Sequence, residues 1–138
     1  MTWFLDTNTC VYFLKGVHPE IRDVLLAKPP AQLGIPSLVA AELLFGAARS
    51  AHPRRNEERV RAFLAPFEVA SFDAAAAAHY AHIRAVTEQA GTLVGPNDLV
   101  IAATVLARCG ILVTHNLREF RRIPNLRVES WVASAGRE

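Results

Sequence analysis

The sequence predicts one α/β domain, spanning residues 1–138, around a mostly parallel sheet of four or five strands. A chain of 138 residues is long enough for one domain and too short for two. Hydrophobic residues make up 51% of it and charged residues 20%, which excludes intrinsic disorder and a coiled coil. Short apolar segments alternate with longer helical ones, and this alternation is typical of a parallel sheet covered by helices on both faces.

The first half of the chain begins with a short strand and two helices. Residues 3–5 form an apolar strand, and Asp6 follows it directly. A helix over 7–14 ends at Gly16, and Pro19 opens a second helix at the position where proline fits the first turn. The elements expected next are a strand over 33–35, an apolar helix from Pro36 or Ser37 to residue 48, and a polar helix over 53–64.

The second half continues the same alternation. A strand over 67–70 precedes an Ala-rich helix that Asp73 caps and Gly91 ends. Gly95 and Pro96 open a further helix, which reaches about residue 108. The continuous apolar run 111–114 predicts a fully buried strand, and a short helical turn and a last strand over 127–129 follow.

The sequence also indicates where the protein works. Its two cysteines are too few for a disulfide framework, which favours a reducing compartment. No apolar run approaches the roughly 18 residues that a membrane span needs. The opening MTWFLDTN lacks the basic start and long apolar stretch of a signal peptide. We therefore expect a cytoplasmic protein with no membrane contact.

The basic residues are unusual, because 13 of the 15 are Arg. They concentrate in the segments 49–61 and 118–127, each with a net charge of +3. Arginine binds phosphate through its planar guanidinium, so both segments suggest a nucleic-acid partner. For the first segment, a solvated helix face with Glu–Arg pairs is at least as good an interpretation. The second has few acids and provides the candidate RNA-binding residues Arg118, Arg121 and Arg122.

Three carboxylates stand where an ordinary core would not place them. Asp6 follows the first strand, although Asp is also a good N-cap for the next helix. Glu42 has only apolar residues and a glycine three and four positions away, so its charge needs a cation, either an Arg or a metal. Asp98 lies in the first turn of an apolar helix, where it could equally complement the helix dipole.

These acids are expected to meet at one edge of the sheet. Ligands of open parallel sheets bind beyond the carboxyl ends of the strands, where Asp6, Glu42, Asp98 and the polar loop 114–119 can converge. Crowded carboxylates repel one another unless a divalent cation neutralises them. Oxygen ligands without His or Cys suit Mg²⁺ or Mn²⁺ better than zinc.

Four motifs in this order resemble the PIN-domain family and, more narrowly, the VapC toxins of bacterial type II toxin–antitoxin pairs. They extend over residues 3–131: LDTN at 5–8, the Glu of SLVAAELLFGA at 37–47, the Asp of GPNDLVIAA at 95–103, and THNLREF with IPNLRVESW at 114–131. The resemblance implies a three-layer α/β/α sandwich and a Mg²⁺-dependent endoribonuclease in which Mn²⁺ can substitute. Its catalytic and metal-binding acids would be Asp6, Glu42 and Asp98, with Asn8 as a possible supporting residue.

The resemblance further implies a homodimer, a VapB-type antitoxin as inhibitor, and a structured RNA substrate such as a tRNA or ribosomal RNA loop. One position departs from the family pattern. Many PIN domains carry a fourth acid two residues after the Thr that corresponds to Thr114, and here that residue is Asn116. Glu119 is a possible substitute. Because Asn116 weakens the acidic set, a catalytically silent module that binds RNA or protein is the alternative.

Overall fold

The computed structural model describes residues 1–133 of the chain. Five short strands alternate with seven α-helices in these residues. The first half contains β1 (Trp3–Leu5), α1 (Thr7–Lys15), α2 (Pro19–Ala27), the 3₁₀ turn Pro30–Gln32, β2 (Leu33–Pro36), α3 (Ser37–Ala48) and α4 (Pro53–Leu64). The second half contains β3 (Glu68–Ala70), α5 (Ala74–Ala90), α6 (Pro96–Ala107), β4 (Ile111–Val113), α7 (Leu117–Phe120) and β5 (Arg127–Glu129).

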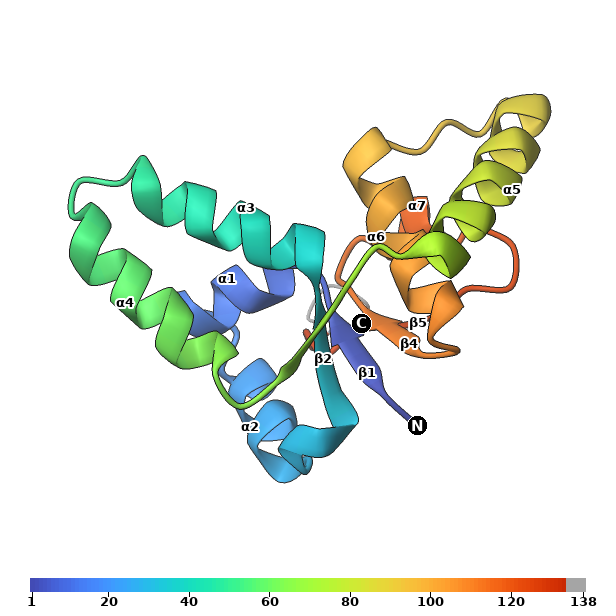
Figure 1. Ribbon diagram of the computed structural model, residues 1–138. Helices are drawn as coiled ribbons and strands as arrows, with labels where there is room; N and C mark the ends of the chain where they lie inside the picture. The colour runs from blue at the N-terminus through green and yellow to red at the C-terminus, as the bar shows by residue number, and fades with distance from the viewer. Residues whose placement is uncertain (134–138) are drawn as a thin grey trace.

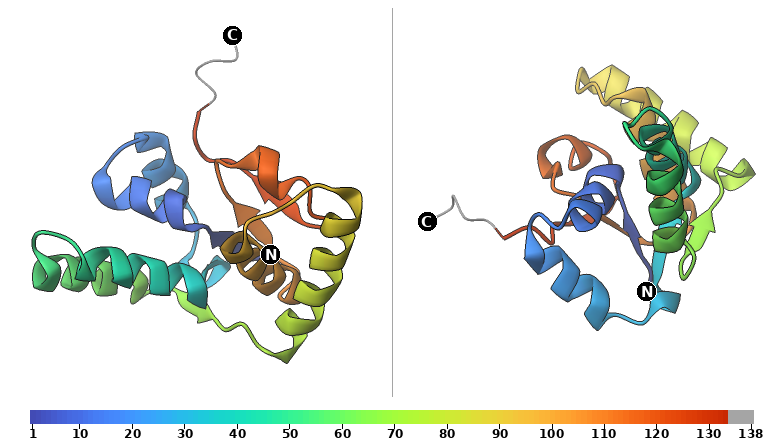
Figure 2. Two further views of the ribbon diagram at one scale, coloured as in Figure 1. Left: turned by 90° about the horizontal axis from the view of Figure 1, so that it is seen from above. Right: turned by 90° about the vertical axis from the view of Figure 1, so that its left-hand side faces the viewer.

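The strands form one sheet in the order β3-β2-β1-β4-β5. Every pairing between them is parallel, so the expected mostly parallel sheet is wholly parallel across the described residues. Figure 1 shows β1 and β2 at the centre, α1 to α4 on the left, and α5 and α6 on the right. The right-hand view in Figure 2 shows α1 and α2 on one side of the strands and α3 to α6 on the other, so the sheet lies between two helical layers. The arrangement confirms the three-layer α/β/α class.

Topology decides where the site lies. The chain leaves β1 for β2 and β3 on one side, then crosses through α5 and α6 to β4 on the other side of β1. Strand order therefore reverses at β1, and ligands of open α/β sheets bind beyond the strand ends at such a point. Asp6 directly follows β1 and occupies this position.

Phe4 holds the central strand tightly between its neighbours. Its ring is almost fully buried. A Cβ atom added at Gly34 on β2 would lie 2.6 Å from the Phe4 Cε1 atom, and one added at Gly110, just before β4, would lie 2.4 Å from Cε2. Only glycine leaves room for the ring on both sides, so β1 has a fixed position in the sheet.

The predicted elements are confirmed, and most boundaries shift by one or two residues. The strand expected over 111–114 ends at Val113, so Thr114 lies just beyond β4 rather than inside it. The structure adds a 3₁₀ turn that contains Pro30, where the sequence predicted only the end of a helix. No helix within residues 1–133 is both long and apolar enough to cross a membrane.

Candidate active site

Asp6 serves both as a helix cap and as a site residue, which are the two roles that the sequence suggested. Its side chain accepts a hydrogen bond of 2.9 Å from the Thr9 backbone N–H and so caps α1. Its own backbone N–H donates to the Val113 carbonyl oxygen at 3.0 Å, which ties it to the end of β4. Burial raises the pKa of the Asp6 carboxyl; hydrogen bonds from Thr114 and Thr9 partly offset this, and Glu42 adds repulsion.

Glu42 projects from α3 toward α1 and α6. The Thr7 hydroxyl donates to its Oε1 atom, and the Asn97 amide donates to its Oε2 atom at 3.0 Å. Glu42 is half-buried, and its protein partners within residues 1–133 are a hydroxyl and an amide rather than an Arg. The other cation that the sequence suggested for it, a metal, stays a prediction. An apolar helix does not reveal which of its faces is covered, and the α3 residue Phe45 is 63% exposed.

Asp98 and Glu119 form the second half of the site. Glu119 Oε2 accepts the Gly95 backbone N–H at 2.8 Å, and its Oε1 accepts the Asn116 amide at 3.0 Å. Burial raises the pKa of Asp98 from 3.8 to about 7, with further contributions from Glu119, Asp6 and Glu42. Burial opposes the charge of Glu119 as well, but its hydrogen bonds from Gly95 and Asn116 and the nearby Arg122 lower its pKa overall.

The four acids come from four separate parts of the chain. They are contributed by the end of β1, by α3, by the first turn of α6 and by α7. Burial is the main cause of the raised Asp98 pKa, and repulsion from Glu119, Asp6 and Glu42 adds to it, as expected for acids that lie near one another. Such a group of carboxylates favours a divalent cation as the species that neutralises it.

The donor set fits Mg²⁺ or Mn²⁺, since every candidate ligand is an oxygen. Among residues 1–133, no three His, Cys, Asp or Glu side chains are grouped closely enough to enclose an ion by themselves. Magnesium commonly uses only one or two carboxylates and keeps several of its waters. The donor set therefore fits an ion that one or two of these carboxylates would hold together with waters.

The remaining sequence candidates occupy different places around this edge. Thr114 is buried and bonds to Asp6, and its hydroxyl accepts the Asn116 backbone N–H at 2.9 Å. Asn116 thus bridges Thr114 and Glu119, while Asn8 is exposed in the first turn of α1. The candidate RNA-binding residues Arg118, Arg121 and Arg122 are exposed, and Arg122 donates to the Leu93 carbonyl oxygen at 2.7 Å.

Sequence reasoning missed two groups that hold the acids in place. They are the Asn97 side chain and the Gly95 backbone N–H, which bind Glu42 and Glu119 respectively. Both belong to the GPND segment that drew attention to Asp98, so their position beside it was the available signal. Neither carries a charge, and a search for charged residues passes over both.

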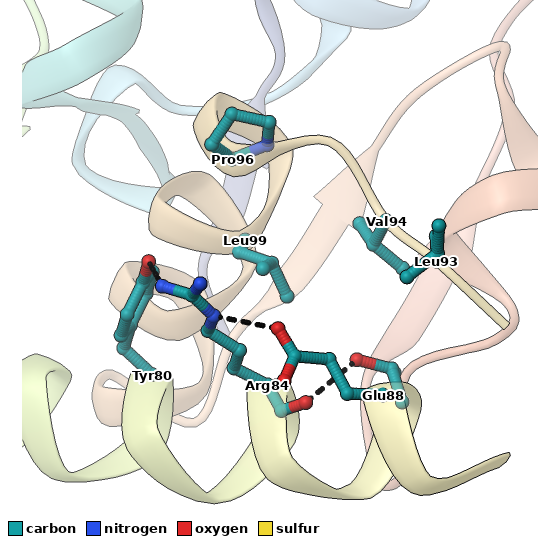
Figure 3. Close-up of a pocket in the computed structure, with 8 residues that line it drawn as sticks. Tyr80, Arg84, Glu88, Leu93, Val94, Pro96 and Leu99 are labelled. Atoms are coloured by element: carbon teal, nitrogen blue, oxygen red, sulfur yellow. Dashed lines mark hydrogen bonds and ion pairs between the residues drawn. The ribbon is translucent and has the colours of Figure 1, made fainter. Parts of the chain in front are cut away.

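A small cavity of about 200 Å³ lies between α5 and the segment that leads into α6. Figure 3 shows that its charged groups turn toward one another. The Arg84 guanidinium bonds to Glu88 at 2.9 Å and to the Tyr80 hydroxyl at 3.0 Å. The cavity therefore offers a ligand mainly apolar walls, and the carboxylate edge is the better candidate for catalysis.

A parallel α/β fold with acids gathered at the strand ends defines a class of domain, and comparison with known proteins gives that class a name. The sequence profile of the PIN domain matches residues 3–126. The chain belongs to the PIN-domain family.

Similar proteins indicate which kind of PIN domain this chain contains. It is 40% identical over 131 residues to the tRNA(fMet)-specific endonuclease VapC of Salmonella typhimurium, covering 95% of this chain and 98% of that one. It is 38% identical over 133 residues to Ribonuclease VapC2 of Rickettsia felis, and this match also covers 95% of this chain and 98% of the other. The VapC-type resemblance inferred from the motifs is thereby confirmed.

Solved structures of VapBC complexes contain the same fold. The fold superposes on a chain of the DNA-bound VapBC complex from Salmonella typhimurium with a TM-score of 0.90 at 40% identity, covering 95% of this chain and 98% of that one. It also superposes on a chain of VapBC2 from Rickettsia felis, bound to a promoter DNA fragment, with a TM-score of 0.86 at 38% identity. That match covers 95% of this chain and 99% of the other. The α/β/α architecture is therefore the one that these VapC-type domains share.

Proposed function

We propose that this protein is an endoribonuclease toxin that hydrolyses RNA phosphodiester bonds with the help of Mg²⁺ or Mn²⁺. The observation that carries the proposal is the meeting of Asp6, Glu42, Asp98 and Glu119 at the strand-order reversal. The names of its relatives, a ribonuclease and a tRNA endonuclease, support the same activity.

In this mechanism Asp6 and Asp98 would hold the metal, and Glu42 would assist. A bound divalent ion would lower the pKa of a water and neutralise charge on the phosphate that the water attacks. The protein contributes positioning, because Thr9 and Thr114 fix Asp6 while Thr7 and Asn97 fix Glu42. In-line attack by water would leave a 5′-phosphate and a 3′-hydroxyl, without a covalent enzyme intermediate.

The substrate is proposed to be the unpaired loop of a structured RNA, such as a tRNA or a ribosomal RNA. Sequence-specific proteins read RNA mainly at single-stranded loops, where bases can be turned outward. The exposed Arg118 and Arg121 lie on and just after α7, beside Glu119, where they can hold the RNA backbone. An enzyme acting on these RNAs would work in the cytoplasm.

A VapB-type antitoxin is the proposed inhibitor, since solved relatives occur in VapBC complexes. A groove of about 610 Å³ between α1, α3 and α4 provides space for a segment of such a partner.

Phe45, 63% exposed on α3, supports the proposal of a homodimer, because exposed aromatic side chains are enriched at protein interfaces. Light scattering of wild type and Phe45→Glu tests this: we expect a dimer and a monomer respectively, and a monomeric wild type at micromolar concentration contradicts it.

The activity itself is tested by sequencing RNA ends after brief expression of the wild type and of Asp6→Asn. We expect new 5′-phosphate ends with the wild type only. With purified protein, EDTA should abolish cleavage and Mg²⁺ or Mn²⁺ should restore it. Full activity in EDTA with 2′,3′-cyclic phosphate products refutes the mechanism. RNA binding with no cleavage under any metal condition instead identifies the catalytically silent alternative.

A further inference from the structure

Three aromatic side chains from α1, from the turn before α2 and from the loop after β4 lie together. The rings of Tyr12 and His18 meet edge to face, with centroids 4.8 Å apart and planes 70° apart. The His115 ring lies 6.4 Å from the His18 ring, and its Nδ1 atom is 3.3 Å from the Ser130 hydroxyl oxygen. We call Tyr12, His18 and His115 the aromatic shelf.

The shelf is attached to the residues that build the active site. His115 stands between Thr114, which bonds to Asp6, and Asn116, which holds Glu119. Tyr12 lies six residues after Asp6 along α1, a rise of about 9 Å on an α-helix. His115 therefore links the shelf to the site, and a nucleotide that flanks the reacting phosphate on this side is the one the rings could contact.

The rings are accessible and held in place. His115 is exposed, and the His18 side chain is 40% exposed. His18 adopts a left-handed backbone conformation with φ of 52°, and the Ile21 N–H donates to its carbonyl oxygen at 2.9 Å. Non-glycine residues rarely adopt this conformation, and here it sets the His18 ring against Tyr12 instead of leaving it free in solvent.

We propose that the aromatic shelf stacks an unpaired nucleobase next to the bond that is cut, and so contributes to the choice of RNA. This inference rests on the proposed ribonuclease function. Stacking suits the shelf because every nucleobase has a π face, and because aromatic side chains are the usual platforms for unstacked bases. Phosphate contacts are available elsewhere, from the Arg residues on and after α7.

The test measures binding separately from cleavage. The full-length protein carrying Asp6→Asn, in EDTA, is titrated into a short fluorescent single-stranded RNA and into an abasic strand of equal length. His18→Ala and His115→Ala remove rings at accessible positions, and His18→Phe keeps a ring without imidazole nitrogens. His82→Ala removes an exposed histidine from α5 and serves as the matched control.

We expect the variant with both alanines to bind the base-containing RNA about tenfold more weakly, the loss typical of one stacked base, with abasic binding unchanged. His18→Phe and His82→Ala should bind both strands as the parent protein does. If the double-alanine variant loses the same affinity for both strands, and the slope of log affinity against log salt concentration becomes smaller by about one, the histidines contact phosphate and the proposal is overturned. Unchanged binding by the double-alanine variant also overturns it. If the parent protein binds neither strand, the stacking proposal is overturned, while the cleavage assay with Mg²⁺ decides the ribonuclease function separately.

Discussion

Replacing Asp98 by Asn should stabilise the metal-free protein at pH 8 and lose this effect as the pH falls. Asp98 is half-buried near Asp6, Glu42 and Glu119, and its pKa is raised to about 7. At pH 8 the folded chain must therefore carry a charge that its surroundings disfavour. Asp98 shares a hydrogen bond with Glu119, and an Asn amide of similar shape removes the charge while it can donate to the same partner.

The size of the effect follows from the pKa of Asp98. Because this pKa rises from 3.8 to about 7 on folding, the folded chain binds more protons between about pH 4 and pH 7. Stability of the wild type therefore falls as the pH rises through that window, and the full penalty is present above it. For a fully buried carboxyl such a rise corresponds to about 4 kcal/mol. Screening of the half-buried Asp98 side chain by solvent leaves roughly 1–2 kcal/mol.

Urea unfolding in EDTA at pH 5 and pH 8 measures this difference. Asp98→Asn should be more stable than the wild type by roughly 1–2 kcal/mol at pH 8 and by much less at pH 5. Asp23→Asn, at an exposed position on α2, controls for the loss of one negative charge. Adding Mg²⁺ should stabilise the wild type and leave Asp98→Asn nearly unchanged. A variant that is less stable than the wild type at pH 8 would refute the reasoning and point to a structural role in the first turn of α6.

Two further predictions concern the fourth acid and the central strand. Asn116→Asp should tighten Mn²⁺ binding by about 1 kcal/mol in calorimetry, while in EDTA it should lower stability by placing a second carboxylate against Glu119. Glu119→Gln should weaken Mn²⁺ binding; if neither change moves the affinity, the loop 114–119 lies outside the metal site. Gly34→Ala should lower the free energy of unfolding by about 1–3 kcal/mol, because its Cβ would meet the buried Phe4 ring. Gly46→Ala, at a glycine with open space around it, should not show this loss.

The sequence predicts the site acids better than it predicts what holds them. Asp6 could be found because it follows an apolar strand directly, and parallel strands end at one edge. The contacts of Glu42 with Thr7 and Asn97 join residues 35 and 55 positions apart, and no local pattern reports them. Asn116 and Glu119 were considered as rivals for one role, whereas the structure joins them by a hydrogen bond. That link is local, but the Gly95 N–H that binds the other Glu119 oxygen lies 24 positions away, and only the fold shows it.

The bond between the Asp6 N–H and the Val113 carbonyl oxygen has a consequence for how the protein is made. A ribosome adds about 5–20 residues per second from the N-terminus, so Asp6 emerges long before β4 and Thr114 exist to fix it. Glu119 is synthesised later still, and β5 packs against β4 only after that. If the chain is the proposed ribonuclease, this order delays its activity until the last quarter of the chain has folded. Unfinished copies of the proposed enzyme would therefore not cut the RNA around them.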